Sequence, residues 1–385
     1  MQETAAAHAP SLSPRAIPSA KPLSSQRLLP LDGLRGVAIL LVLIHHFLPM
    51  HMPTVLGRWA GRFASSAWVG VDLFFVLSGF LITGILLDTR GKPRFFRNFY
   101  ARRTLRVFPL YFGALAVTLL IIPLARSLPL HLREQRWLWL YASNLYPLLR
   151  HQSYSFPSDL NLQYTHFWSL AVEEHFYLVW PLVVFLLPRR PLMWAAAGLS
   201  FMAMILKWRM QRAGFSPDVL YQTTFLRMDG LLLGGWAAMA FRGGCDPRLL
   251  RRGAKMAAAV FGTVLAVMFI RDAGLYRGKP DVEIVGYSCV ALFFTAVLVL
   301  AAAPSAGWLQ RILVAKWLGF LGLYSYGIYV FHCLLMAVFA SMVPQTMPGA
   351  EYVTAVVSVS GSILAAVISY QVYEKRFLGL KRQFA

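Results

Sequence analysis

Long apolar stretches, separated by short polar segments, recur along most of this chain. Ten of them approach the roughly 20 residues that an α-helix needs to cross a bilayer. They lie at about residues 31–50, 68–87, 104–124, 168–187, 191–207, 225–241, 255–271, 283–303, 315–340 and 352–373. The residues are 58% hydrophobic and 14% charged, whereas an ordinary soluble protein is about 45–50% apolar. The pattern predicts an all-α fold, a polytopic membrane helix bundle of about ten transmembrane helices.

Basic residues indicate how these helices are oriented. Ten spans put both termini on one side, and a cytoplasmic N-terminus places 22 of the 37 Lys and Arg residues inside and 12 outside. Residues at span ends are counted here with the adjoining loops, and Arg35, Arg106 and Arg227 fall within spans. Because loops rich in Lys and Arg tend to stay in the cytoplasm, we expect both termini there.

The net charge of +21 raises the question of a nucleic-acid partner. The basic residues flank apolar segments instead of covering a soluble face, so we expect no nucleic acid and assign these charges to topology and to anionic lipid headgroups.

Composition divides the chain into three regions. Residues 1–30 are rich in Ala, Pro and Ser and lack the apolar core of a signal peptide, so we expect a disordered cytoplasmic tail. Residues 31–373 form the predicted transmembrane domain, and residues 374–385 a basic cytoplasmic tail.

Two ionisable residues in the first apolar stretch, LDGLRGVAILLVLIHHF, are the strongest clue to function. Arg35 and His46 are eleven positions apart, which at about 100° per residue places them within roughly 20° of one helical face and roughly 16 Å apart along the axis. His45 lies about 80° off that face. Ionisable groups are costly in hydrocarbon, so this arrangement predicts a site that holds an anionic ligand near one membrane surface and performs proton chemistry toward the other.

The remaining spans also carry polar residues. They are Asp72, Arg106, Glu173, Glu174, Arg227, Asp229, His332 and Glu374. Any one of them is explained by pairing within the bundle or by reaching the headgroups. Taken together they favour a common polar cavity, because a bundle turns its charges inward.

The segment FWSLAVEEHFYLVWP places Glu173, Tyr177 and Trp180 on one helical face, with Glu174 turned about 100° away. We expect one of the two carboxylates to orient the His46 ring and leave its other nitrogen free to accept a proton.

A basic cluster precedes and enters the third span. It consists of Arg94, Arg97, Arg102, Arg103 and Arg106. The cluster has two interpretations, a topology signal or a clamp for the phosphates of an anionic cofactor, which Arg binds bidentately.

The sequence does not indicate a metal site or a disulfide. Adjacent His45 and His46 point about 100° apart, and His51 has no acidic partner nearby. The three cysteines are far apart: Cys245, Cys289 and Cys333. We therefore expect no metal.

Seven segments, in order from residue 31 to residue 377, together resemble acyltransferase family 3, a family of multi-span membrane acyltransferases that includes bacterial O-acetylases of lipopolysaccharide and other glycans. They are LDGLRGVAILLVLIHHF, VGVDLFFVLSGFLIT, ARRTLRVFPLYF, FWSLAVEEHFYLVWP, FLRMDGLLLG, LGLYSYGIYVFHCLL and YEKRF. The sequence departs from the family pattern at His175, where Gln is usual, and at Lys375 and Arg376, where Arg–Pro is more common.

The resemblance implies that Arg35 and His46 are the essential pair. It also puts further residues on family-typical positions: Asp72, Ser78, Arg103, Arg106, Glu173, Arg227 and His332. We assign catalysis to His46 as base, with Arg35 and Glu173, and CoA binding to Arg102, Arg103 and Arg106. The other polar positions, Asp72, Ser78, Glu174, Arg227, Asp229 and His332, are expected to contact substrate or support the site.

The implied activity is O-acyl transfer in the bacterial inner membrane. The expected donor is cytoplasmic acetyl-CoA, or another acyl-CoA, with no permanently bound cofactor, and the expected acceptor is a hydroxyl of an envelope or exported glycan or glycolipid. Homo-oligomers and envelope-biosynthesis partners fit this activity. Two alternatives remain open, a transporter or flippase for a glycan precursor and a structural partner in an envelope assembly; a transporter predicts internal repeats, and none is evident in the sequence.

Overall fold

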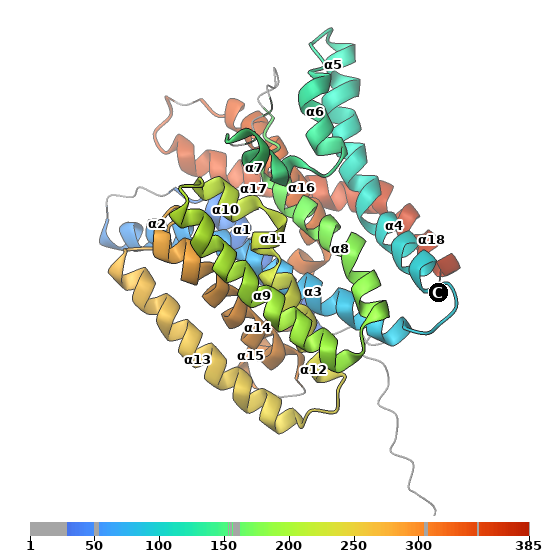
Figure 1. Cartoon of the computed structure of the whole chain (residues 1–385). Helices are drawn as coiled ribbons and strands as arrows, with labels where there is room; N and C mark the ends of the chain where they lie inside the picture. The colour runs from blue at the N-terminus through green and yellow to red at the C-terminus, as the bar shows by residue number, and fades with distance from the viewer. Residues whose placement is uncertain are drawn as a thin grey trace, which may run out of the picture.

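A computed structural model describes residues 29–49, 54–152, 154, 156, 162–303, 307–344 and 346–384, and within these ranges every regular element is a helix (Figure 1). The predicted all-α fold is confirmed. Residues 1–28 of the expected tail lie outside the described residues, and the first helix, α1, begins at Leu29.

Nine helical segments in the described part of the chain are long and apolar enough to cross a membrane. Their main helices are α1 (Leu29–Phe47), α3 (Gly70–Thr89), α4 (Phe95–Ala116), α8 (Trp168–Leu186), α9 (Arg189–Arg212), α13 (Pro247–Arg271), α14 (Tyr287–Ala302), α16 (Lys316–Ser341) and α17 (Ala350–Ser369). Each overlaps one of the apolar stretches predicted from the sequence.

The remaining predicted span, residues 225–241, which is the sixth along the chain, is shorter than expected. Its helix is interrupted at Met228, between α11 (Thr224–Arg227) and α12 (Asp229–Phe241). At about 1.5 Å per residue, the 13 residues of α12 reach only about two-thirds of the hydrocarbon thickness. The interruption adjoins two buried charged residues, Arg227 and Asp229, which pair with neighbouring helices as described below.

Short helices connect the spans. They are α2 (Val55–Ser66), α5 (Ile122–Ala125), α6 (Leu132–Trp139), α7 (Tyr146–Arg150), α10 (Pro217–Gln222), α15 (Trp308–Leu313) and α18 (Lys375–Leu380). A π-helical turn, Tyr370–Glu374, joins α17 to α18, and α18 contacts α4. The predicted C-terminal tail is therefore helical through Phe384.

Glycines permit the closest helix contacts. A Cβ on Gly79 of α3 would lie 1.9 Å from the Leu231 carbonyl oxygen of α12, and one on Gly234 of α12 would lie 2.0 Å from the Val76 carbonyl oxygen of α3. Between α1 and α16, a Cβ on Gly322 would lie 1.9 Å from the Asp32 carbonyl oxygen. Small residues at such crossings let membrane helices approach and gain van der Waals contact.

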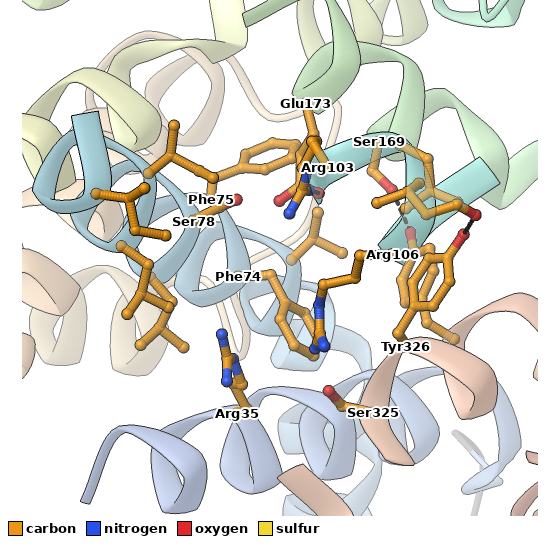
Figure 2. Close-up of a pocket in the computed structure, with 18 residues that line it drawn as sticks. Arg35, Phe74, Phe75, Ser78, Arg103, Arg106, Ser169, Glu173, Ser325 and Tyr326 are labelled. Atoms are coloured by element: carbon orange, nitrogen blue, oxygen red, sulfur yellow. Dashed lines mark hydrogen bonds and ion pairs between the residues drawn. The ribbon is translucent and has the colours of Figure 1, made fainter. Parts of the chain in front are cut away.

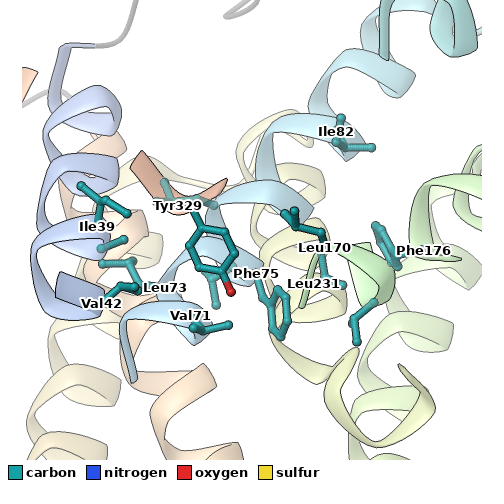
Figure 3. Close-up of a cluster of buried hydrophobic side chains, with 14 of the residues drawn as sticks. Ile39, Val42, Val71, Leu73, Phe75, Ile82, Leu170, Phe176, Leu231 and Tyr329 are labelled. Carbon is teal, nitrogen blue, oxygen red and sulfur yellow. The ribbon is translucent and has the colours of Figure 1, made fainter. Parts of the chain in front are cut away.

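The core of the bundle lies around α1, α3, α12 and α16, and Figure 3 shows its apolar side chains. Ile39 of α1, Leu73 and Phe75 of α3 and Leu231 of α12 are all at most 1% exposed. The outer helices are more exposed than the core helices. Only 11% of the apolar stretch of α13 is buried within the protein, against 72% of the apolar stretch in the segment that contains α3. The exposed apolar surface of α13 is suited to lipid contact.

We predict that Gly79→Ala destabilises the protein, because the added methyl group meets backbone and not a movable side chain. Overpacking of this kind costs about 1–3 kcal/mol. Gly198→Ala on α9 is the matched control, since nothing lies within 4 Å of a Cβ there. Thermal unfolding in detergent should show a lower midpoint for Gly79→Ala only; equal midpoints would contradict the packing assigned to α3 and α12.

Candidate active site

A cavity of about 340 Å³ lies among α1, α3, α4, α8 and α16. Its polar lining residues are Arg35, Ser78, Arg103, Arg106, Ser169, Glu173, Ser325, Tyr326 and Tyr329. Figure 2 shows these side chains gathered from helices far apart in the sequence. The lining includes three guanidinium groups and one carboxylate.

Arg103 is held between both glutamates of α8. Its Nη2 lies 3.8 Å from a Glu173 carboxylate oxygen and its Nε lies 3.8 Å from a Glu174 carboxylate oxygen. The guanidinium also stacks over the Tyr177 ring, 3.7 Å from its centroid. These contacts fix Arg103, and they explain how two adjacent acidic residues are accommodated inside an apolar bundle.

The other two cavity arginines have fewer anionic partners. Arg35 Nη1 donates to Asp32 at 3.1 Å, one turn away on α1. Arg106 has no carboxylate within 4.0 Å in the described part of the chain, although its side chain enters the cavity (Figure 2). Arg102, which the sequence grouped with them, is exposed and does not line the cavity.

Hydroxyl groups complete the cavity wall. Ser78 of α3 and Tyr177 of α8 share a hydrogen bond, and so do Ser169 of α8 and Tyr329 of α16. The sequence analysis missed Ser169, Ser325, Tyr326 and Tyr329 as cavity residues. Ser169 precedes Glu173 by four positions, so helical periodicity was a signal for it. The others required knowledge of how α16 packs.

His46 does not line this cavity, and the expected orientation by a carboxylate is wrong. The Nδ1–H of His46 donates to the Val42 carbonyl at 2.9 Å, while Glu173 and Glu174 face Arg103. The backbone therefore fixes the ring and leaves Nε2 as the acceptor. Arg35 and His46 serve two neighbouring sites along α1.

His46 belongs to a group of histidines that sequence analysis recognised only in part. The ring centroid of His332 lies 4.8 Å from that of His46 and 4.9 Å from that of His166. His332 and His166 are buried, whereas His46 is exposed. His166 was missed because it precedes the apolar run of α8, where a polar residue is unremarkable.

A third polar group lies apart from the cavity. Arg227 donates to Asp72 at 2.7 Å, and both side chains are almost fully buried. Lys207 pairs in the same way with Asp229 at 2.7 Å, and Ser288 joins them. The single common cavity expected from the sequence is therefore wrong, because the charges form three groups. Lys207 is the last residue of the predicted span 191–207 and was counted among the 12 outside basic residues, but it is buried in the bundle.

A ring nitrogen of His46, a ring nitrogen of His332 and the Cys333 sulfur lie within 4.8 Å of one another, close enough for a metal. His45 is not part of this group, and its Nδ1–H donates to the Ala64 carbonyl at 3.0 Å. His51 lies outside the described residues. The expectation that no metal binds stays a prediction.

Comparison with known proteins decides the family. The sequence profile of an acyltransferase domain matches residues 29–373. The chain belongs to acyltransferase family 3. This acyltransferase is 28% identical over 354 residues to the peptidoglycan O-acetyltransferase OatA of Listeria monocytogenes, an alignment that covers 89% of this chain and 54% of the relative. It is 26% identical over 371 residues to the O-acetyltransferase OatA of Staphylococcus aureus, covering 91% of this chain and 57% of the relative.

The acyltransferase thus spans a little over half the length of these relatives. No solved structure matches it. The family and the nine candidate membrane helices make it a multi-pass membrane acyltransferase, and the resemblance read from the seven sequence segments is confirmed.

We predict that Asp72→Asn destabilises the acyltransferase, because it leaves the buried Arg227 cation without its anion. Breaking a buried pair from one side costs about 3–5 kcal/mol. Lys279→Gln, which removes an exposed partner of Asp272, should leave the unfolding midpoint near wild type. Similar midpoints for Asp72→Asn and wild type would contradict the structural role of this pair.

Proposed function

We propose that this acyltransferase moves an acetyl group from cytoplasmic acetyl-CoA to a hydroxyl of an envelope or exported glycan or glycolipid. The observation that carries the proposal is the cavity in which Arg35, Arg103 and Arg106 converge. Three guanidinium groups at one cavity predict an anionic ligand, and phosphates are the anions that Arg binds best through paired hydrogen bonds.

The donor phosphates are assigned to Arg106 and Arg35. Arg103 already contacts two carboxylates, whereas Arg106 has no carboxylate within 4.0 Å among the residues that the structure describes. Glu374 lines a second small pocket together with Arg106 but is not within ion-pair distance of it, so a phosphate would supply the directly paired counter-ion. The pantetheine arm of CoA is an extended chain, and it would carry the thioester from these arginines along α1 toward His46, roughly 16 Å away along the axis.

His46 is assigned as the general base. A sugar hydroxyl is a weak nucleophile at neutral pH, so a base must take its proton as the oxygen attacks the thioester carbonyl. With Nδ1–H donating to Val42, the lone pair on Nε2 is available, and the exposure of His46 allows an acceptor to reach it. Glu173 contributes by positioning Arg103.

The proposed location is the bacterial inner membrane with both termini in the cytoplasm, which requires the shorter segment of α11 and α12 to cross as a tenth span. The basic bias of the loops supports this orientation. Arg35 near the start of α1 and Arg103 in the first half of α4 would then lie toward the cytoplasm, where acyl-CoA is made.

A glycan acceptor is supported by the names of the relatives, which are a peptidoglycan O-acetyltransferase and an O-acetyltransferase. The test is transfer by the purified protein in liposomes, with acetyl-CoA as donor and N-acetylglucosamine oligomers as acceptor probe. Release of CoA together with O-acetylated sugar supports the proposal. Sugar movement across the membrane without CoA release would instead support the transporter alternative.

We predict that Arg106→Ala weakens acetyl-CoA binding by about 10- to 100-fold, the loss expected when a hydrogen bond to a charged group is removed. Arg102→Ala is the matched control, because Arg102 is exposed and outside the cavity lining. Calorimetry on detergent-solubilised protein measures both. Equal affinities for the two variants would leave the arginine cluster as a topology signal.

We predict that His46→Ala lowers acetyl transfer by at least about 10²-fold, as is typical for loss of a general base. The neighbouring residue is an internal control, because the Nδ1–H of His45 points to Ala64 of α2, and His45→Ala should retain most activity. Transfer rates under saturating acetyl-CoA distinguish the two. Full activity of His46→Ala would exclude it as the base.

A further inference from the structure

Three imidazole rings form a continuous row from the exposed end of α1 into the bundle. Ring centroids are separated by 4.8 Å between His46 and His332 and by 4.9 Å between His332 and His166. The three residues come from α1, α16 and the turn before α8. Their meeting is a product of the fold and not of sequence proximity.

Each ring presents one nitrogen as donor to the backbone and the other as acceptor. His46 Nδ1–H donates to Val42, His332 Nδ1–H donates to Tyr329 at 2.6 Å, and the Nε2–H of His166 lies 3.3 Å from the Val330 carbonyl. Because a carbonyl only accepts, these bonds fix the tautomers of the neutral rings. The opposite nitrogens carry lone pairs.

The lone pairs of the two inner rings are not satisfied. Nε2 of His332 and Nδ1 of His166 are buried and have no hydrogen-bond partner in the described ranges. A buried acceptor without a donor costs free energy and calls for a reason. Neighbouring lone pairs of this kind are suited to receive a proton and pass it on.

The inner end of the row reaches the cavity through Tyr329. The Tyr329 ring centroid lies 5.2 Å from that of His332 and 5.6 Å from that of His166. Its hydroxyl is hydrogen-bonded to Ser169, and both residues line the cavity. Tyr329 therefore packs against the two inner rings, while its hydroxyl, which also donates to the His166 carbonyl oxygen at 3.0 Å, lies at the cavity wall.

We propose that His46, His332 and His166 form a proton relay that ends at the Tyr329 and Ser169 hydroxyls. The inference rests on the proposed acetyl transfer. The acceptor oxygen forms a bond to the acetyl carbon, the carbon–sulfur bond of the thioester breaks, and the sulfur leaves as thiolate. The hydroxyl proton passes to His46 and then through His332 and His166 to the cavity wall. CoA withdraws from His46 through the cavity, where its thiolate takes up this one proton. No other reactant is required.

His332 and His166 are thus assigned a role in catalysis without contact to the acceptor. The relay would return His46 to its neutral form after each turnover, so the base is available again. A metal held by His46, His332 and Cys333 is the competing explanation for the unsatisfied nitrogen, and the experiment below separates the two.

The test uses the full chain in liposomes, with acetyl-CoA and N-acetylglucosamine oligomers as probes. His332→Ala should lower the transfer rate by about 10- to 100-fold while acetyl-CoA binding is retained. Added imidazole should raise the rate of His332→Ala by about five-fold or more, because the defect is in proton transfer. Cys333→Ala, on the same helix, should transfer within about two-fold of wild type. Metal analysis of wild type and Cys333→Ala is run in parallel.

The outcomes are distinguishable. Absence of transfer by wild type overturns the proposed function and the relay together. Wild-type rates in His332→Ala, or a loss that imidazole does not restore while acetyl-CoA still binds, overturn the relay alone. So does a stoichiometric metal that is lost, together with activity, in Cys333→Ala. If His332→Ala does not fold, Tyr329→Phe decides: a loss of about ten-fold with intact acetyl-CoA binding supports the relay, and unchanged transfer overturns it.

Discussion

The cost of placing charge inside an apolar helix bundle determines how this protein is organised. Each buried cation must pair with an anion, stack on an aromatic ring or line a cavity that can hold an anionic ligand. Arg227 and Lys207 meet Asp72 and Asp229 at 2.7 Å, fully enclosed. Arg103 meets two carboxylates and the Tyr177 ring at the edge of the cavity. Arg106 alone among the cavity arginines lacks a carboxylate within 4.0 Å in the described residues. The charges that are fully paired support the fold, whereas the unpaired Arg106 is suited to bind an anionic ligand.

Close helix packing makes these pairings possible. The Arg227–Asp72 pair joins α11 to α3, next to the crossing at which Gly79 and Gly234 bring α3 and α12 into backbone contact. Gly322 brings α16 against α1, and the same pair of helices carries His332 and His46, whose rings are 4.8 Å apart. The glycines thus set the geometry of both the structural charge pair and the histidine row, although none of them contacts either site.

The sequence predicted the helical fold and its membrane spans well, because apolar length is a local property of the chain. It also identified Arg35, Arg103, Arg106 and Glu173, which meet at one cavity, since ionisable residues stand out in apolar segments. It failed where the answer depends on which helices meet. Glu173 and Glu174 are paired with Arg103, and neither orients His46. Lys207, at the end of a predicted span, is buried and paired with Asp229. His166 joins His332 from a turn that has no distinctive pattern. Arg35 and His46 share a helical face, but they belong to two sites: Arg35 lines the cavity and His46 contacts His332. Helical periodicity alone does not show which neighbouring helices each residue contacts.

The most direct test of the account is the position of a bound donor. An experimentally determined structure of the protein with a non-hydrolysable thioether analogue of acetyl-CoA should show the ligand in the cavity among α1, α3, α4, α8 and α16, with phosphate oxygens at hydrogen-bond distance from Arg106 and Arg35 and the acetyl end directed toward His46. An analogue bound with its phosphates away from both arginines, or in a different part of the molecule, would contradict the assignment of this cavity as the donor site.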